Sequence, residues 1–164
     1  MKIALLGYMG SGKSTLGKTL AKRLNYSFIE LDERVEEAMG MSISTAIEIK
    51  GELFFRKCEN AVLKELLATV PDSVVLSLGG GTPAYYNHMD LLNEHMLTVY
   101  LDVPVQTLVQ RLQASHPRPL LQGIDDVEEY IAKHLFDRMP FYYRAQKVLK
   151  GSEISVEDVV NAIG

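Results

Sequence analysis

The segment Gly7–Thr15 reads GYMGSGKST and fits the pattern G-x-x-x-x-G-K-[ST]. Its glycines leave backbone N–H groups accessible, so the chain can wrap closely around a polyphosphate. In this pattern the lysine reaches the β and γ phosphates, and the next hydroxyl binds Mg2+. We therefore expect a site for a nucleoside triphosphate with Mg2+, in which Ser14 is the metal ligand and Lys13 is catalytic. The nucleotide-binding residues expected in this segment are Gly10, Ser11, Gly12, Lys13, Ser14 and Thr15.

Two carboxylates follow the second apolar run, where IELDER places Glu30 and Asp32 two residues apart. At the end of a strand this spacing puts both side chains on one face. Paired carboxylates there can hold the hydroxyl groups of a second substrate or a hydrated Mg2+. The alternative for Asp32 is an acidic helix N-terminus without a ligand.

Three arginines are candidates for contact with an anion. Arg56 in LFFRKCE either extends to the surface or contacts a ligand. Arg138 in RMPFYYR contacts a ligand or belongs to an ordinary helix surface. Arg118 stands between two prolines in RLQASHPRPLLQG, residues 111–123, which we interpret as a loop. Long ordered loops in compact domains are commonly lids, and a lid arginine can neutralise charge on a transferring phosphate.

Three consecutive glycines, Gly79, Gly80 and Gly81, end the apolar run in VVLSLGGGTP. They could form a second phosphate loop, a hinge, or a place where the backbone comes close to a ligand. A second phosphate loop is disfavoured, because no lysine and hydroxyl follow as they do in GSGKS. We expect these glycines to form a bare backbone floor for the substrate that accepts the phosphate.

The apolar pattern predicts the elements that position these residues. Short runs rich in β-branched residues predict strands at Ile3–Leu6, Phe28–Leu31, Val74–Leu78, Leu97–Leu101 and, more weakly, Lys147–Leu149. Segments between them, such as Ser14–Leu24 and Glu52–Val70, have helical spacing, and Ser155 with Asp158 predicts the start of a last helix. Alternating strands and helices predict a parallel sheet covered on both faces, with ligands at the C-terminal strand ends.

The composition predicts one domain with small-molecule partners. The chain has 164 residues, of which 47% are hydrophobic, enough for one substantial core. Its net charge of -4 lacks the basic excess of proteins that bind nucleic acid or anionic membranes. No apolar run is long enough for a membrane helix, and the single cysteine, Cys58, fits a reducing compartment. We expect a cytoplasmic monomer that binds neither nucleic acid nor membrane.

Taken in order, these motifs resemble the shikimate kinase family. The segments that carry the resemblance are GYMGSGKSTLGKTLAKRL, LDERVEEAMGMSI, GELFFRKCE, LSLGGGT, RPLL and RMPFYYRA. The resemblance implies an α/β fold of the P-loop NTPase type, with three α/β/α layers and a five-stranded parallel sheet of order 2-3-1-4-5. It implies one kinase domain over residues 1–164, with substrate-binding helices at about 33–65 and a lid at about 112–124. It also implies transfer of the γ phosphate of ATP, with Mg2+, to the 3-hydroxyl of shikimate in aromatic amino acid biosynthesis.

The resemblance assigns the substrate side of the site to particular residues. It implies that Asp32 binds the hydroxyl groups of shikimate and takes part in catalysis. The carboxylate of shikimate would meet Arg56 and Arg138. The backbone of the three glycines would contact the ring and its hydroxyl groups.

The resemblance also places residues around ATP. Arg118 would be the lid arginine near the phosphates, catalytic together with Lys13, and Arg111 would lie beside the adenine. One position departs from the family, because Glu30 stands where an aspartate usually assists the Mg2+ shell through water. Ser14 is therefore the firmer expectation for a metal ligand, with Glu30 acting through water.

Two other functions remain open at this stage. Another small-polyol or sugar-acid kinase, such as gluconate kinase, needs the same phosphate loop and a clamp for a carboxylate. An ATPase or nucleotide switch would usually have an aspartate at the end of a strand beside the first one. TVYLD does end in Asp102, but we interpret this residue as a loop residue or helix cap before Pro104.

Overall fold

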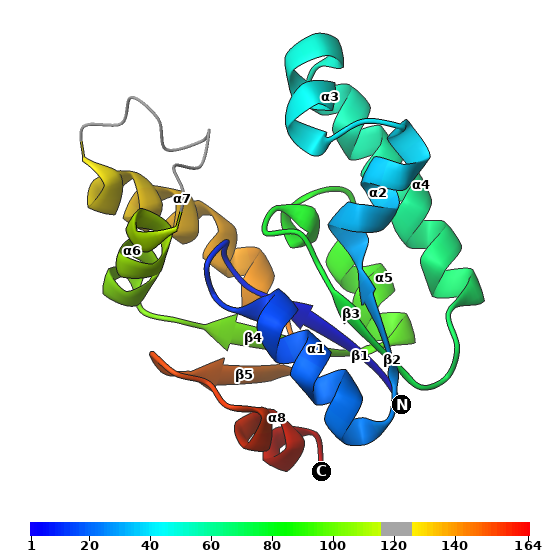
Figure 1. The fold of residues 1–164 in the computed structure, drawn as a ribbon, viewed down its shortest axis with the longest axis vertical. Helices are drawn as coiled ribbons and strands as arrows, with labels where there is room; N and C mark the ends of the chain where they lie inside the picture. The colour runs from blue at the N-terminus through cyan, green and yellow to red at the C-terminus, as the bar shows by residue number, and fades with distance from the viewer. Residues whose placement is uncertain (116–125) are drawn as a thin grey trace.

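The structure is a computed structural model that describes residues 1–115 and 126–164. Its strands are β1 (Lys2–Leu6), β2 (Ser27–Glu30), β3 (Val74–Ser77), β4 (Leu97–Asp102) and β5 (Lys147–Lys150). Its helices are α1 (Lys13–Leu24), α2 (Leu31–Met39), α3 (Ile43–Lys50), α4 (Glu52–Thr69), the short 3-10 helix η1 (Thr82–Ala84), α5 (His88–His95), α6 (Val105–Ala114), α7 (Val127–Tyr142) and α8 (Val156–Ile163). Figure 1 shows the strands as one layer with helices around it.

The described strands form one parallel sheet in the order β2-β3-β1-β4-β5. The central strand is β1, whose Ile3 lies opposite Val75 of β3 and Leu97 of β4. Central strands of parallel sheets are covered on both faces, which explains why β1 and β3 are almost continuously apolar. The predicted fold class, the strand order and the presence of the five predicted strands are confirmed, although individual strand ends differ by one residue.

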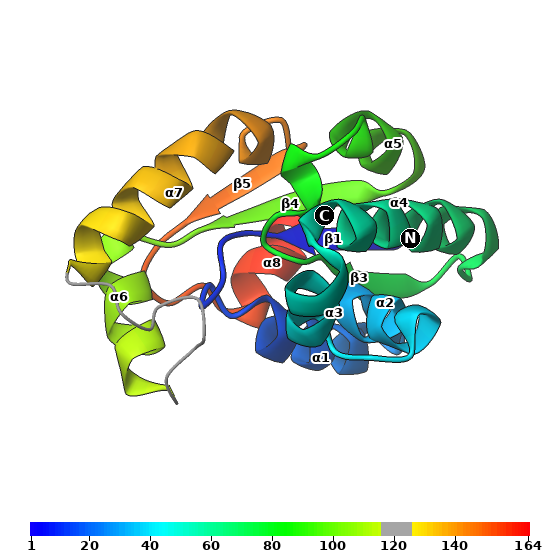
Figure 2. The same ribbon diagram turned by 90° about the horizontal axis from the view of Figure 1, so that it is seen from above.

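Alternate residues of β1 face two different helical layers. Ile3 and Leu5 pack with α1 and α8, whereas Ala4 and Leu6 pack with α4, α5 and α7. Viewed from above in Figure 2, α1 and α8 lie on one side of the sheet, and α5 and α7 lie on the other. In Figure 1, α2 and α3 lie beyond the upper end of β2, beside the first turns of α4. The sheet thus carries helices that can reach its C-terminal edge from both sides.

Side chains cap three of the described helices, α3, α7 and α8, but not α1. In α7 the Asp126 carboxylate accepts a hydrogen bond from the N–H of Glu129 over 3.0 Å. Ser155 Oγ accepts a hydrogen bond from the N–H of Asp158 over 3.1 Å, and the Asp158 carboxylate accepts from the N–H of Ser155 over 2.8 Å. This is the predicted capping box of α8. Ser42 caps α3 through the N–H of Thr45. No side chain caps α1, so its N-terminal turn can present N–H groups to an anion.

Three local expectations differ from the structure. The second strand ends at Glu30, one residue earlier than predicted, because the next residue already opens α2. Asp102 is neither a loop residue nor a helix cap, because pairing with β5 extends β4 through it, and Pro104 holds the cap position of α6. The segment from Arg111 to Ala114 is not part of the expected loop, because α6 continues through Ala114.

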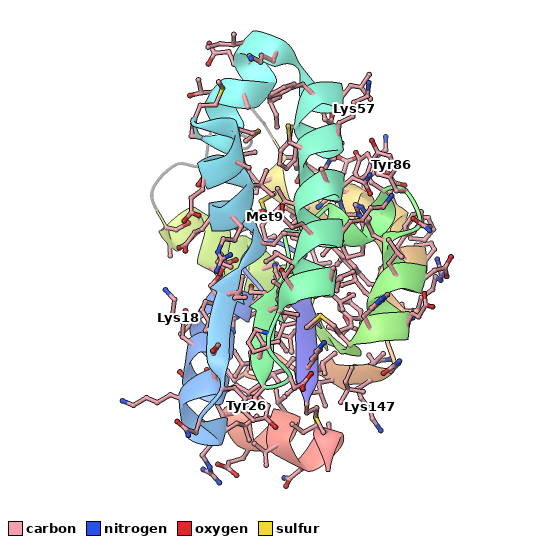
Figure 3. The ribbon with its side chains drawn as sticks, turned by 90° about the vertical axis from the view of Figure 1, so that its right-hand side faces the viewer. Met9, Lys18, Tyr26, Lys57, Tyr86 and Lys147 are labelled. Atoms are coloured by element: carbon pink, nitrogen blue, oxygen red, sulfur yellow. The ribbon has the colours of Figure 1, made fainter. Side chains whose placement is uncertain are left out.

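The outer surface carries many of the charged side chains. Lys18, Lys57 and Lys147 are exposed and point away from the body of the molecule in Figure 3.

Among residues 1–115 and 126–164, no helix combines the length and the apolar character needed to cross a membrane.

Candidate active site

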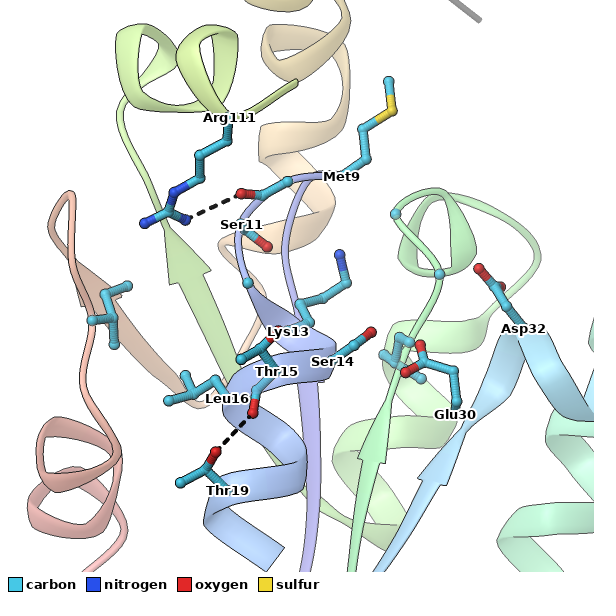
Figure 4. A pocket seen from close by; sticks show the side chains of 16 residues that line it. Met9, Ser11, Lys13, Ser14, Thr15, Leu16, Thr19, Glu30, Asp32 and Arg111 are labelled. Carbon is cyan, nitrogen blue, oxygen red and sulfur yellow. Dashed lines mark hydrogen bonds between the residues drawn. The ribbon is translucent and has the colours of Figure 1, made fainter. Parts of the chain in front are cut away.

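The phosphate loop, Gly7–Gly12, connects the end of β1 to the start of α1 (Figure 4). Gly10 and Gly12 have φ angles of 83° and 92°, in the left-handed region that favours glycine. A Cβ at Gly10 would also lie 3.1 Å from Cγ of Leu112 in α6. The loop conformation therefore favours glycine at Gly12, which the motif specifies, and also at Gly10, which it does not.

Lys13 lies across this loop at the start of α1. Its side chain is buried, with 8% of the residue exposed, and Nζ donates to the carbonyls of Gly7 over 2.8 Å and Tyr8 over 3.1 Å. The ammonium group and the N-terminus of α1 are therefore close together, and both favour an anion. The hydroxyl of Ser14 lines the cavity onto which the phosphate loop opens (Figure 4). This arrangement suits a polyphosphate with a cation beside it.

The loop opens onto a cavity of about 660 Å3, within the size range of small-molecule sites. The phosphate loop and the first turns of α1 form one wall. The end of β2 and two residues of the glycine loop (Gly79–Gly81), namely Gly79 and Gly80, contribute to the opposite wall. Arg111 of α6 and Ile154, just before α8, line it as well. One cavity thus connects the predicted nucleotide residues with three of the predicted acceptor residues, Asp32, Gly79 and Gly80.

Arg111 is held rigidly at the nucleotide end of the cavity. Its Nη1 donates to the carbonyl of Gly10 over 3.1 Å, and its Nη2 donates to the carbonyl of Ser152 over 2.6 Å. The guanidinium group thereby links the phosphate loop to the segment that follows β5. Ile154 supplies an apolar surface to the same cavity, and sequence reasoning missed it because nothing in its local pattern marks a ligand contact.

Glu30 and Asp32 both line the cavity, but not through strand alternation. Glu30 is the last residue of β2, and Asp32 lies in the first turn of α2. Burial and, to a smaller extent, the nearby charge of Glu59 raise the pKa of Asp32 to about 6, against the opposing effect of Lys13. The carboxyl group of Asp32 is therefore ionised at neutral pH, although its surroundings disfavour the charge.

Arg56 is fixed by a buried network on α4. Its Nη1 donates to Glu59 Oε1 over 2.9 Å, and the other oxygen of Glu59 accepts from the hydroxyl of Thr82 over 2.8 Å. Glu59 is only 1% exposed. The guanidinium also lies 3.9 Å from the centre of the Tyr85 ring and 4.8 Å from that of Phe55. Packing and charge together leave the Arg56 guanidinium little freedom.

The three glycines form the point where the acceptor residues meet. A Cβ at Gly79 would lie 2.7 Å from a carboxyl oxygen of Asp32, and one at Gly80 would lie 3.1 Å from Nη1 of Arg138. A Cβ at Gly81 would collide with the guanidinium of Arg56. The structure therefore brings Asp32, Arg56 and Arg138 together around the glycine loop, as a bare backbone floor requires.

Other sequence-derived candidates have different positions. Arg144, the second arginine of RMPFYYR, pairs at the surface with Asp90. Arg118 lies outside the described residues. Glu59 and Thr82 were missed, although Glu59 stands three residues after Arg56 on the same helix, a spacing that places the two side chains together.

The oxygen donors near the phosphate loop fit Mg2+. Ser14, Glu30 and Asp32 line one cavity and offer hydroxyl and carboxylate oxygens, which Mg2+ prefers. Within the described part of the chain, no group of three or more His, Cys, Asp or Glu side chains could hold a metal by itself. A site with few protein ligands is what Mg2+ uses when phosphates and water complete its shell.

Comparisons with known proteins agree on one family. A family model for shikimate kinase matches residues 9–164. A shikimate kinase from Flavobacterium psychrophilum is 41% identical and is aligned over 99% of this chain and 96% of its own length.

Solved structures give the same result. A shikimate kinase from Bacteroides thetaiotaomicron has a TM-score of 0.91 and 36% identity, covering 99% of this chain and 96% of its own. One from Acinetobacter baumannii, solved in complex with shikimate, has a TM-score of 0.87 and 32% identity, covering 99% and 89%. A gluconokinase from Sinorhizobium meliloti has a TM-score of 0.59 with 17% identity, covering 98% and 88%, which shows a likeness of fold alone.

Removal of Glu59 should destabilise the protein strongly. Glu59→Ala leaves the buried Arg56 without its closest anionic partner, so we expect the free energy of unfolding to fall by about 3 kcal/mol. The control is Glu52→Ala, because Glu52 lies 3.6 Å from Arg56 but its side chain is 56% exposed, and it should lose less than about 1 kcal/mol. Denaturant titration of both variants measures the difference, and equal losses would contradict the buried network.

Asp32→Asn should stabilise the protein above pH 6. The pKa of Asp32 is about 6 in the folded protein and about 3.9 in the unfolded chain, so the folded state binds more protons between these values. Stability therefore falls as pH rises through this window, and the full cost is present above pH 6. We expect Asp32→Asn to gain about 3 kcal/mol at pH 7.5 and almost nothing at pH 4. Thermal melts at both pH values measure this, and an equal gain at both would argue against charge burial.

Proposed function

The chain belongs to the shikimate kinase family, and we propose that it transfers the γ phosphate of ATP to the 3-hydroxyl of shikimate, giving shikimate 3-phosphate and ADP. The observation that carries this proposal is the convergence of a carboxylate and two guanidinium groups on a floor of three glycines beside the phosphate loop. The acceptor is a small cyclic molecule with one carboxylate and several hydroxyl groups. A clamp of two arginines and one aspartate is complementary to those groups.

On the ATP side, the phosphate loop and the N-terminus of α1 would surround the polyphosphate, with Lys13 on the β and γ phosphates. Ser14 would hold Mg2+, with Glu30 acting through water. When bound, Mg2+ neutralises the charge on these phosphates. Arg111, fixed between Gly10 and Ser152, would lie beside the adenine.

On the acceptor side, Arg56 and Arg138 would bind the carboxylate of shikimate. Asp32 would accept a hydrogen bond from the reacting hydroxyl and hold its oxygen in line with the γ phosphate. With a pKa of about 6, the Asp32 carboxyl is ionised at neutral pH and can also take the hydroxyl proton. Because the transition state of phosphoryl transfer is loose, positioning by Asp32 matters more than its strength as a base.

The remaining proposals concern the lid, the binding partners, the cellular location and the oligomeric state. We propose that Arg118, in a lid at about 112–124, contacts the transferring phosphate and that the lid excludes water. The net charge of -4 supports small-molecule partners over nucleic acid or an anionic membrane. We also propose that the chain acts as a cytoplasmic monomer.

The acceptor identity is tested by a coupled assay of ADP release with MgATP. We expect rapid ADP release with shikimate, little with gluconate, and little without an acceptor. Preference for gluconate would favour the sugar-acid kinase alternative. Equal turnover without any acceptor would favour an ATPase or a switch.

The two arginines should affect the two substrates differently. Arg56→Ala and Arg138→Ala each remove a charged hydrogen-bond donor to the shikimate carboxylate, so the KM for shikimate should rise by a factor on the order of 10 to 100. The KM for ATP should change less than about twofold, because neither arginine lies at the nucleotide end of the cavity. Arg144→Ala is the control, since Arg144 pairs with Asp90 away from the site. Equal changes in both KM values would contradict the carboxylate role.

A further inference from the structure

One face of α7 carries three polar side chains in a row. His134, Arg138 and Tyr142 follow each other at intervals of four residues, so they lie above one another on the helix. Arg138 is in the middle of this face, with Nη1 close to Gly80. Each of its two neighbours on the face forms a hydrogen bond that involves a tyrosine hydroxyl.

The first of these bonds joins α7 to the phosphate loop. The hydroxyl of Tyr8 and Nδ1 of His134 are 2.9 Å apart, and the two rings meet edge to face with centres 5.4 Å apart. Burial raises the pKa of the Tyr8 hydroxyl and lowers that of His134, so the hydroxyl donates to a neutral imidazole at neutral pH. The Arg138 guanidinium lies 5.9 Å from the centre of the same Tyr8 ring.

The second bond joins α7 to the glycine loop. The hydroxyl of Tyr142 donates to the carbonyl of Gly80 over 2.5 Å. The Tyr142 ring is fully buried and packs against Tyr100 with ring centres 4.9 Å apart. Burial also raises the pKa of Tyr142, so its hydroxyl keeps the proton that it donates. This bond fixes the orientation of the peptide group that follows Gly80 in the acceptor floor.

The helix needs such support at this point. Pro140 lies between Arg138 and Tyr142 and cannot donate a hydrogen bond to the carbonyl of Phe136. A helix that lacks a bond in its last turns bends more easily, which would move Arg138 relative to the glycine loop. The two tyrosine hydroxyls hold the helix one turn before and one turn after Arg138.

We propose that the hydroxyls of Tyr8 and Tyr142 are positioning groups, which hold Arg138 at the distance from the glycine loop that the acceptor carboxylate requires. This inference rests on the proposed contact of Arg138 with that carboxylate. A guanidinium binds a carboxylate through two hydrogen bonds in fixed geometry, so a small shift of the helix weakens both. The hydroxyls themselves touch neither substrate in this proposal.

The test uses Tyr8→Phe and Tyr142→Phe, which keep the rings and remove only the hydroxyls. Each should raise the KM for shikimate by roughly threefold to tenfold, the range expected for one lost hydrogen bond. The KM for ATP should stay within about twofold. The matched control is Tyr143→Phe, because the Tyr143 hydroxyl donates to Asp102, and its KM for shikimate should not change.

Combination with Arg138→Ala separates positioning through this arginine from a general loss of stability. If the hydroxyls act through Arg138, adding Tyr8→Phe to Arg138→Ala should leave the KM for shikimate within about twofold of that of Arg138→Ala alone. If the KM for shikimate of the double variant instead rises by the product of the two single-variant fold-changes, the inference for Tyr8 is overturned. Melting temperatures of all variants are measured alongside, and a lower melting temperature with an unchanged KM for shikimate would show a structural role alone.

The inference and the proposed function fail in different ways. If Arg138→Ala raises the KM for shikimate and both tyrosine variants do not, the positioning role is wrong and the contact of Arg138 with the carboxylate stands. If Arg138→Ala has no effect on that KM, the proposed contact is wrong and the positioning role falls with it.

Discussion

A carboxylate and two guanidinium groups are packed directly against the backbone at the end of β3, and the acceptor site depends on this close approach. Asp32, Arg138 and Arg56 each contact one residue of Gly79–Gly81, at distances that leave no room for a methyl group without displacement. The three side chains come from α2, α7 and α4, which approach the C-terminal edge of the sheet from different directions. A small substrate can meet all three only if the backbone between them is bare. The sheet order matters for the same reason, because it places β3 beside both β1 and β2.

The buried charges of Arg56 and Asp32 differ in whether a charged partner stabilises them. Arg56 is paired with the buried Glu59. Both carboxylate oxygens of Glu59 accept a hydrogen bond, one from Arg56 and one from Thr82. Among the residues that the structure describes, Asp32 has no such partner, and burial together with the nearby charge of Glu59 raises its pKa to about 6. The charge of Arg56, which should only bind the acceptor, is therefore stabilised by a buried partner. The charge of Asp32, which should exchange hydrogen bonds with the reacting hydroxyl, is disfavoured by burial. Perturbed carboxylates of this kind are common at functional sites.

The parts of the site that could be predicted from the sequence are those whose chemistry lies within one short segment. The phosphate loop and the strand pattern have this property, and the resemblance of several motifs supplied the roles of Arg56 and Arg138. Glu59 had a local signal, its spacing from Arg56, but acids at this spacing are ordinary on helix surfaces, and burial was needed to distinguish it. Tyr8 and His134 are 126 residues apart, and no local pattern connects them. The role of Arg118 stays a prediction.

The two glycine-rich segments use glycine for different physical reasons. In the phosphate loop, Gly10 and Gly12 have positive φ angles, so the backbone conformation itself favours glycine. No residue of Gly79–Gly81 has a positive φ angle, and other residues could adopt this backbone. What excludes side chains there is the space taken by the acceptor residues. A hinge does not account for this segment either, because the sheet bond from Leu78 and the hydroxyl of Tyr142 hold it in place. Gly79–Gly81 is therefore a rigid backbone surface, and it lacks side chains because Asp32, Arg138 and Arg56 pack directly against it.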